Sequence, residues 1–177
     1  MPVSSLIPIR RRRAGVSSVA VLAAAAAVGT CAAAFAAAPA PTCATSGLVI
    51  WLDTQGNGTA GSIYYQLEFT NQSGHTCTLR GYPGVSAVDL SGHQLGSAAS
   101  RNTVRAPHLV MLADGKTGVA VLRIVDVGAF SPSACHETPA AGLRVFPPNR
   151  RTAKYVPFPF AACSRRGTTY LSVEAVR

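Results

Sequence analysis

Five cysteines and four histidines are the residues of this chain that could do the widest range of chemistry: nucleophilic catalysis, metal binding or disulfide formation. No two cysteines have the Cys-x-x-Cys spacing of redox and zinc sites, and the histidines fall in four separate loop-like segments. The choice among these chemistries depends on whether the chain meets a reducing or an oxidising compartment. The N-terminal residues bear directly on that question.

The first 36 residues have the composition of an export signal. Four consecutive arginines, residues 10–13, precede an Ala- and Val-rich run from Ala14 to Ala38, and Ala34-Phe35-Ala36 supplies the small residues of a cleavage site. We therefore expect a signal peptide at residues 1–36, with general secretion ahead of twin-arginine export because the usual Phe-Leu pair does not follow the arginines.

Two anchored forms of the N-terminus stay open as alternatives. An apolar run of about 20 residues is long enough to span a bilayer uncleaved, although alanine is a poor membrane residue. Val28-Gly29-Thr30-Cys31 is a weak version of a lipoprotein cleavage box. After the signal we expect a short tether, residues 37–45, and a single domain, residues 46–177.

Removal of the signal leaves four cysteines, and an even number of cysteines in an exported chain predicts disulfides. Four cysteines can pair in three ways, and the sequence spacing favours one of them. The midpoint between residues 43 and 77 is residue 60, and that between residues 135 and 163 is residue 149; both midpoints lie in turn-like segments. The predicted pairs, each flanking a hairpin and each stabilising the fold by roughly 3 to 4 kcal/mol, are Cys43 with Cys77 and Cys135 with Cys163.

Other chemistry has little support in the sequence. Neither a G-x-S-x-G nor an H-E-x-x-H motif occurs, and the seven acidic residues fall mostly in turns or on polar strand faces. A copper carrier would need at least two of the histidines near Met111 or a cysteine. We expect a non-enzymatic protein with no cofactor and no metal site, and keep an unrecognised secreted hydrolase and a copper carrier as alternatives. The four histidines are His75, His93, His108 and His136.

An aromatic segment rich in proline is the best candidate for a binding face. In the run from residue 155 to 160, Tyr155, Phe158 and Phe160 alternate with prolines, which cannot sit in a central strand. The segment should therefore lie on a sheet edge or cover one end of the fold, either as a binding face or as a lid over the core. Tyr82, before Pro83-Gly84, is interpreted as packing beside a turn, with presentation to a ligand as the alternative.

The elements that must position these residues are β-strands, because short runs of alternating apolar residues are separated by Gly, Pro, Asn, Asp and Ser. An Asp114-Gly115 pair indicates a hairpin. The pattern predicts an all-β fold, an antiparallel immunoglobulin-like sandwich of about seven or eight strands, with a closed barrel as the alternative. The expected strands include residues 48–52, 63–69, 85–90, 109–112, 119–127, 143–145 and 171–175.

The net charge and the distribution of basic residues limit the classes of partner that the chain is expected to bind. The chain carries a net charge of +9, but without the four N-terminal arginines twelve basic residues face seven acidic ones, a net charge of +5. The remaining arginines are scattered and form no basic stripe with aromatic residues, so nucleic acid is not expected as a partner. The charge is interpreted mainly as ordinary solvated charge and the partner is left open, with a cell-envelope polymer or protein as a candidate and a membrane contact only through an uncleaved or lipidated N-terminus. The excess of arginine over lysine and the abundance of alanine suggest a GC-rich bacterial genome.

Several motifs together resemble an actinobacterial secreted family, domain of unknown function 4232, over about residues 43 to 176. One departure is visible, since Leu112-Ala113-Asp114-Gly115 stands where that family usually has Leu-x-Pro-Gly. The resemblance implies a secreted or lipid-anchored β-sandwich and brings no established activity and no catalytic residues. It rests on Cys43, Tyr65-x-Leu67-x-Phe69-Thr70-Asn71, Cys77-Thr78-Leu79-x-Gly81-Tyr82-Pro83-Gly84-Val85, Leu143-Arg144-Val145-x-Pro147-Pro148 and Cys163.

Overall fold

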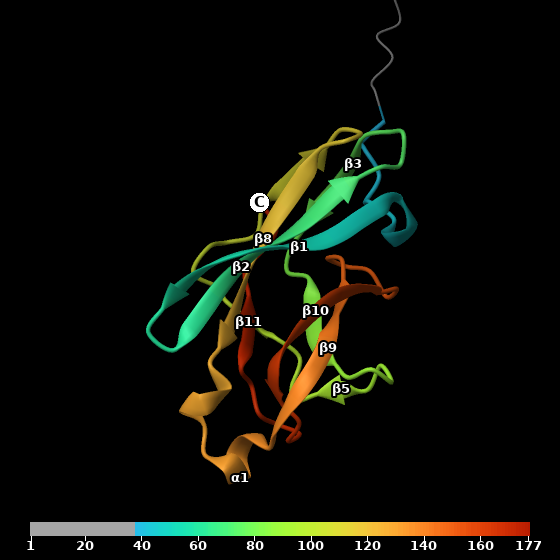
Figure 1. Cartoon of the computed structure of the whole chain (residues 1–177). Coiled ribbons are helices and arrows are strands. Elements are labelled where there is room, and N and C mark those ends of the chain that lie inside the picture. Colours follow the sequence, from blue (N-terminus) through green and yellow to red (C-terminus); the bar gives the residue numbers. More distant parts are fainter. Residues whose placement is uncertain (1–37) are drawn as a thin grey trace, which may run out of the picture. The chain divides into compact units, whose positions relative to one another are not determined.

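The structure is a computed structural model that describes residues 38–177, and in this range its regular secondary structure is mostly β-strand (Figure 1). The predicted signal segment and Cys31 lie outside the described residues. Helical structure in the described range is limited to three single turns, as the lack of a 3.6-residue apolar period predicts. These turns are η1 (Thr45–Gly47), η2 (Val127–Ala129) and α1 (Pro132–Cys135).

The larger sheet has five strands in the order β1-β2-β8-β11-β6. β8 lies at its centre, as its apolar residues on both faces predict. All neighbours pair antiparallel except β11 and β6, which are parallel, so the expected purely antiparallel sheet is wrong at this edge. The strands are β1 (Leu48–Thr59), β2 (Ser62–Asn71), β8 (Thr117–Val125), β11 (Leu171–Val173) and β6 (Ser100–Arg101).

A four-stranded sheet, in the order β10-β9-β4-β5, and a two-stranded sheet, β3-β7, complete the domain. The described range has eleven strands where seven or eight were expected, because two-residue strands such as β5 and β6 leave no periodic signal in the sequence. The strands of these two sheets are β10 (Lys154–Cys163), β9 (Glu137–Phe146), β4 (Gly84–Val88), β5 (Gln94–Leu95), β3 (Cys77–Arg80) and β7 (Leu109–Leu112).

One core joins the inner faces of all three sheets. In β1, Leu48, Ile50 and Leu52 are buried while Trp51 between them is 45% exposed, which confirms the predicted alternation. Apolar residues of β2, β8, β9, β4, β3 and β7 belong to the same cluster, whose members all lie between residues 43 and 176. Because this core and both disulfides lie inside residues 38–177, that range forms a self-contained folding unit.

Both predicted disulfides are present. Cys43 pairs with Cys77 across the β1–β2 hairpin, and Cys135 pairs with Cys163 across the β9–β10 hairpin. Residues assigned to a tether are packed against the domain, since the Cys43 N–H donates to the Thr78 carbonyl at 2.9 Å and Thr45 is buried. The first disulfide therefore attaches the beginning of the described range to β3.

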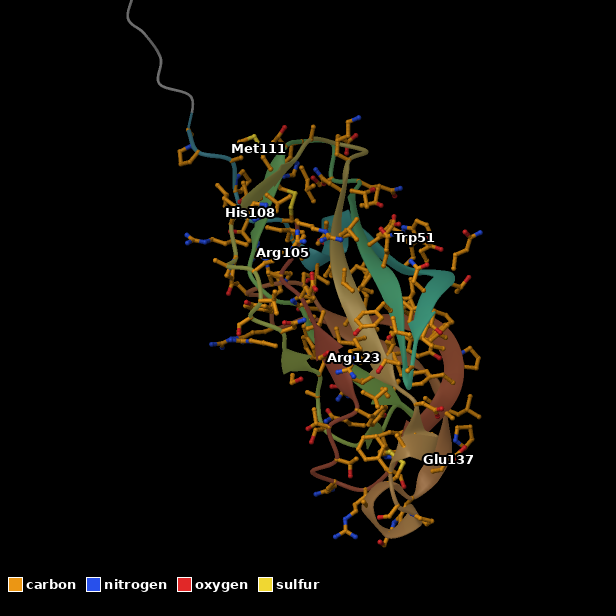
Figure 2. The ribbon with its side chains drawn as sticks, turned by 90° about the vertical axis from the view of Figure 1, so that its left-hand side faces the viewer. Trp51, Arg105, His108, Met111, Arg123 and Glu137 are labelled. Carbon is orange, nitrogen blue, oxygen red and sulfur yellow. A yellow bond between two sulfur atoms is a disulfide. The ribbon has the colours of Figure 1, made fainter. Side chains whose placement is uncertain are left out.

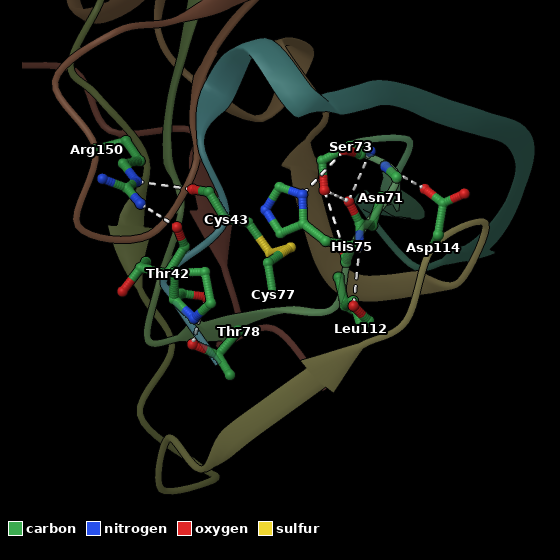
Figure 3. Close-up of a disulfide and its surroundings, with 12 residues drawn as sticks. Thr42, Cys43, Asn71, Ser73, His75, Cys77, Thr78, Leu112, Asp114 and Arg150 are labelled. Carbon is green, nitrogen blue, oxygen red and sulfur yellow. Dashed lines mark hydrogen bonds between the residues drawn. A yellow bond between two sulfur atoms is a disulfide. The ribbon is translucent and has the colours of Figure 1, made fainter. Parts of the chain in front are cut away.

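A buried asparagine organises the loop before β3 (Figure 3). The Asn71 amide Nδ2 donates to the carbonyls of His75 and Leu112 at 2.8 and 2.9 Å, and its Oδ1 accepts from the Ser73 N–H and hydroxyl. The loop is further held by the Gly74 N–H, which donates to Asp114 at 2.8 Å. Every polar atom of the buried amide is thus hydrogen-bonded, which offsets its desolvation.

The Asp114-Gly115 turn does not make the predicted hairpin. The strands that it connects, β7 and β8, belong to different sheets: β7 pairs with β3, and β8 pairs with β2 and β11. The tight Asp-Gly turn reverses the chain direction. The Asp114 side chain accepts a hydrogen bond from the Gly74 N–H, and β7 pairs with β3, the strand that follows the Gly74 loop. A turn signal predicts the reversal and leaves the choice of strand partners to the core.

Candidate functional site

The predicted binding residues Tyr155, Phe158 and Phe160 all lie on β10, an edge strand of the four-stranded sheet. This position agrees with the expectation from the prolines of the segment. The register with β9 shifts between Pro157 and Phe160, so the strand bulges in the middle of the aromatic run. The bulge separates the three aromatic residues into two groups.

Phe158 and Phe160 pack against the core, and Phe160 also lines two pockets at the surface. The Phe158 ring packs edge-on against Tyr65 of β2, with ring centroids 4.9 Å apart, and lies 5.5 Å from the Phe160 ring. Both are partly buried against the main apolar cluster. This arrangement corresponds to the lid interpretation of the aromatic segment.

Tyr155 stands apart and remains 53% exposed. Its hydroxyl donates to the Ala141 carbonyl at 2.7 Å, and its ring lies against the backbone of Gly142. A Cβ atom at residue 142 would come within 2.8 Å of the Tyr155 ring, so glycine is required for this close approach. The ring is therefore held in one position on the outer face of the sheet.

Beside the Tyr155 ring is a pocket of about 550 Å³, here called the Tyr155 pocket. This volume is within the usual range of small-molecule sites. One wall is Tyr155, the opposite wall is the turn that connects β4 to β5, and Arg144 of β9 lies between them. The pocket is lined by Val88, Asp89, Leu90, Ser91, Gly92, Arg144, Ala153, Lys154 and Tyr155.

Arg144 brings a positive charge to the floor of the Tyr155 pocket. It is the direct cross-strand partner of both Tyr155 and Ser86, so the three side chains share one face of the sheet. Its Nη2 donates to the Gln94 side-chain oxygen at 3.0 Å, whereas its buried Nε has no acceptor within residues 38–177. The guanidinium charge is not paired with a carboxylate among the ion pairs of residues 38–177, so an oxyanion bound in the pocket would find a charged hydrogen-bond donor there.

The turn opposite Tyr155 is stabilised by its own aspartate. Asp89 Oδ1 accepts from the Ser91 and His93 N–H groups at 2.9 and 2.8 Å, and Oδ2 lies 3.3 Å from the His93 ring. The backbone hydrogen bond from His93, followed by that from Ser91, lowers the pKa of Asp89. Leu90, expected within a strand at residues 85–90, instead lies in the turn after β4 and is 96% exposed.

The histidine, cysteine and acidic side chains that the sequence offered for metal binding or catalysis do not come together in one site of the described residues. Within residues 38–177 no group of three or more His, Cys, Asp or Glu side chains could hold a metal ion. Asp53 and Glu68 are close enough for Asp53 to contribute, after desolvation, to the raised pKa of Glu68, but they share an open sheet face with Trp51. In the same described range, no helix is long and apolar enough to cross a membrane.

Two residues of the Tyr155 pocket, Arg144 and Leu90, were not predicted from the sequence to lie at a binding site. Arg144 is part of the Leu143-Arg144-Val145 run, but nothing in that run shows which cross-strand neighbours it has. Leu90 could have been placed outside the strand from the Ser91-Gly92 turn that follows it directly. The arrangement of an exposed ring, an exposed leucine and a guanidinium is suited to binding a molecule with an apolar body and an anionic group.

Comparison with known proteins places the whole described domain in one family. A family model matches residues 43–177, beginning at the first disulfide cysteine. Comparison with the curated proteins and with the solved structures found no match. Because the matched range covers most of the chain, this protein belongs to that family, which is described as a domain of unknown function (DUF4232).

Proposed function

We propose that the protein is an exported, non-enzymatic binding module with an immunoglobulin-like sandwich, and that its Tyr155 pocket takes ligands with an apolar or aromatic body and a carboxylate. Two disulfides in a small β-rich domain support an extracytoplasmic location, where such bonds persist. Secretion, or retention at the cell envelope through the N-terminal segment, brings the pocket to envelope polymers and proteins. An actinobacterial origin fits the arginine- and alanine-rich composition.

The observation that carries the proposal is the Arg144 side chain, which lines the same pocket as its cross-strand partner, the exposed Tyr155 ring. A carboxylate bound in the pocket would pair with the guanidinium, while Tyr155 and Leu90 would cover the apolar part of the ligand. Binding without catalysis is supported by Asp89, the only carboxylate of the pocket, because its oxygens are already held by the turn. No carboxylate of the pocket is therefore left free to act as a general base.

The test uses a matched pair of probes, N-acetylphenylalanine and its amide, titrated into isotope-labelled protein and followed by NMR. The carboxylate probe should shift the signals of Tyr155, Leu90 and Arg144, and the amide should bind at least about tenfold more weakly because it lacks the charge. Arg144→Gln should remove this difference between the probes. Arg166→Gln, which removes an exposed charge elsewhere, should retain it.

The proposal is wrong if both probes bind equally well, or if the carboxylate probe leaves the Arg144 and Tyr155 signals unchanged at about 10 mM, since a competent pocket should bind such a probe by then. Export is tested separately by the intact mass of the protein recovered from its host. A chain that begins near residue 37, or one carrying a lipid on Cys31, supports the extracytoplasmic assignment. A full-length chain confined to the cytoplasm with four reduced cysteines contradicts it.

A further inference from the structure

The outer face of the β3–β7 sheet carries exposed apolar residues next to a basic one. Leu109 and Met111 of β7 are 59% and 66% exposed, while Leu112, on the opposite face of the strand, is buried. Leu109 is the direct cross-strand partner of Arg80, so their side chains are neighbours on the same face. Exposed apolar side chains gathered on one face are a feature of surfaces that contact proteins or membranes.

The loop before β7 extends this surface. Val104 is 82% exposed, and Arg105 and His108 are exposed beside it. Figure 2 shows Arg105, His108 and Met111 along one side of the domain, away from Trp51. The name β7 face is used below for Arg80, Val104, Arg105, Leu109 and Met111.

A second pocket, of about 590 Å³, adjoins the β7 face and is here called the Arg101 pocket. Arg80, Arg101 and Arg150 line it, and the Arg101 guanidinium lies 5.6 Å from the centre of the Tyr82 ring. The Tyr82 hydroxyl donates to the Arg105 carbonyl at 3.3 Å and so connects the pocket to the exposed loop. The charges of Arg80 and Arg101 at one cavity fit an anion with several oxygens, such as a phosphate.

No carboxylate neutralises this region. None of the residues that line the Arg101 pocket is acidic, and the sequence contains no Asp or Glu between Asp89 and Asp114. The two ion pairs found in the described residues, His93 with Asp89 and Arg177 with Glu174, involve none of the arginines of the pocket. The positive charge of Arg80 and Arg101 is therefore open to an external anion.

The beginning of the described range runs along the same sheet. Thr42 forms a parallel bridge with Thr78, and Thr78 is the cross-strand partner of Met111, so the three residues form one row. Arg150 anchors this segment through its Nε, which donates to the Cys43 carbonyl at 2.7 Å, and through a hydrogen bond from its Nη2 to the Thr42 carbonyl. The described range thus begins beside the β7 face.

We propose that the β7 face and the Arg101 pocket together dock the domain on an anionic phospholipid membrane. A headgroup phosphate occupies the Arg101 pocket, and Val104, Leu109 and Met111 enter the boundary between headgroups and acyl chains. Exposed apolar side chains add a hydrophobic contribution that a soluble polyanion would not use, which favours a membrane over a charged polymer. The contact is made by the folded domain itself and is independent of any anchor in the N-terminal segment.

The experiment uses residues 38–177 with both disulfides formed, which separates docking of the domain from anchoring by the leader. Binding is measured by co-sedimentation with vesicles of phosphatidylcholine containing phosphatidylglycerol, and with vesicles of phosphatidylcholine alone. We expect binding to the anionic vesicles that weakens at least about tenfold without phosphatidylglycerol and in about 0.5 M salt, because the arginine contribution is screened.

Paired variants test the two components of the surface. Leu109→Ser with Met111→Ser should weaken vesicle binding at least about fivefold, and Arg80→Glu with Arg101→Glu at least about tenfold. The matched controls are Val49→Ser, which removes an exposed apolar side chain from β1, and Arg166→Glu, which reverses an exposed charge. Both controls should bind as the parent does, and circular dichroism should show that each variant is folded.

Three outcomes overturn the proposal. The first is that the parent domain does not sediment with anionic vesicles at low salt. The second is that the folded Leu109 and Met111 double variant, or the arginine double variant, binds as well as the controls. The third is that inorganic polyphosphate binds the domain while vesicles do not, because the Arg101 pocket would then serve a soluble phosphate polymer.

Discussion

The ring of Tyr155 lies directly against the backbone of Gly142 on the neighbouring strand, where a Cβ atom would be 2.8 Å from Cε2 and 2.9 Å from Cζ. The same Cβ atom would also collide with the carbonyl oxygen of Val156, which belongs to the backbone and cannot rotate away. The absence of a side chain at residue 142 thus brings the aromatic ring down onto the sheet and forms one wall of the Tyr155 pocket.

Gly142→Ala should therefore destabilise the domain and displace the Tyr155 ring. We expect a loss of about 1 to 3 kcal/mol in the free energy of unfolding, the usual cost of overpacking, measured by urea denaturation. Gly58→Ala is a suitable control, because a Cβ atom at residue 58 would meet nothing within 4 Å. Gly167 is not suitable, because its φ of +90° strains any side chain placed there. An unchanged midpoint for Gly142→Ala would contradict the close packing of Tyr155.

Asn71→Ala should be strongly destabilising. The change removes both donors to the His75 and Leu112 carbonyls and the acceptor of the Ser73 N–H in a buried position. We expect a loss of about 3 kcal/mol, since each unpaired buried group costs about 1 to 3 kcal/mol. Gln72→Ala, at an exposed neighbouring position, should change the unfolding free energy by less than about 0.5 kcal/mol. Equal losses in the two variants would show that the Asn71 network is not stabilising.

Each disulfide should contribute a similar amount of stability. The bonds join residues separated by 34 and 28 positions, and the loop-entropy relation gives about 3 to 4 kcal/mol for loops of this length. Urea denaturation of the Cys43→Ala, Cys77→Ala variant and of the Cys135→Ala, Cys163→Ala variant measures each contribution. In the parent protein, alkylation should label these cysteines only after reduction, and labelling of a native thiol would contradict the pairing.

Tyr170 should make the domain sensitive to alkali. Burial raises the pKa of its hydroxyl to about 12 from an ordinary value of 10.0. Between these values the unfolded chain loses the proton while the folded chain keeps it, so stability is complete below pH 10 and falls as the pH rises towards 12. We expect a decrease of about 1 to 2 kcal/mol, because solvent screens part of the effect.

Tyr170→Phe provides the control for this alkaline effect. The variant loses the hydrogen bond from the hydroxyl to the Leu95 carbonyl, 3.2 Å in length, and should be less stable at neutral pH by about 1 kcal/mol. Its unfolding free energy should then depend less on pH between 10 and 12 than that of the parent. The same pH dependence in both proteins would show that another group is responsible.

The Asp89 turn should hold its form at neutral pH and loosen only in acid. The pKa of Asp89 lies below its ordinary value of 3.8, so its stabilising hydrogen bonds are present above this pH and are lost as the pH falls through the lowered value. The Ser91 and His93 amide signals, followed by NMR from about pH 6 to pH 2, should move together at the acid end. Signals that stay fixed throughout would contradict the assigned role of Asp89.

The sequence by itself determined the features that depend on local pattern. Alternation in β1 predicted that Leu48 and Leu52 are buried and Trp51 exposed, because strand side chains point to opposite faces in turn. The spacing of the cysteines around two turns predicted both disulfides, since a hairpin brings residues at equal distances from its tip together. The prolines of the segment from 155 to 160 predicted a position at a sheet edge or over one end of the fold, because proline has no N–H to donate within a central strand.

Only the tertiary structure decided which of these strands became neighbours and which side chains shared a surface. Tyr170, which directly precedes β11, is buried because its ring packs beside Gly96. Tyr155 and Arg144 meet through the β9–β10 register, and Leu109 and Arg80 through the β3–β7 register. Register and sheet order are set by burial of the whole core, so residues far apart in sequence could not be assigned to one site beforehand.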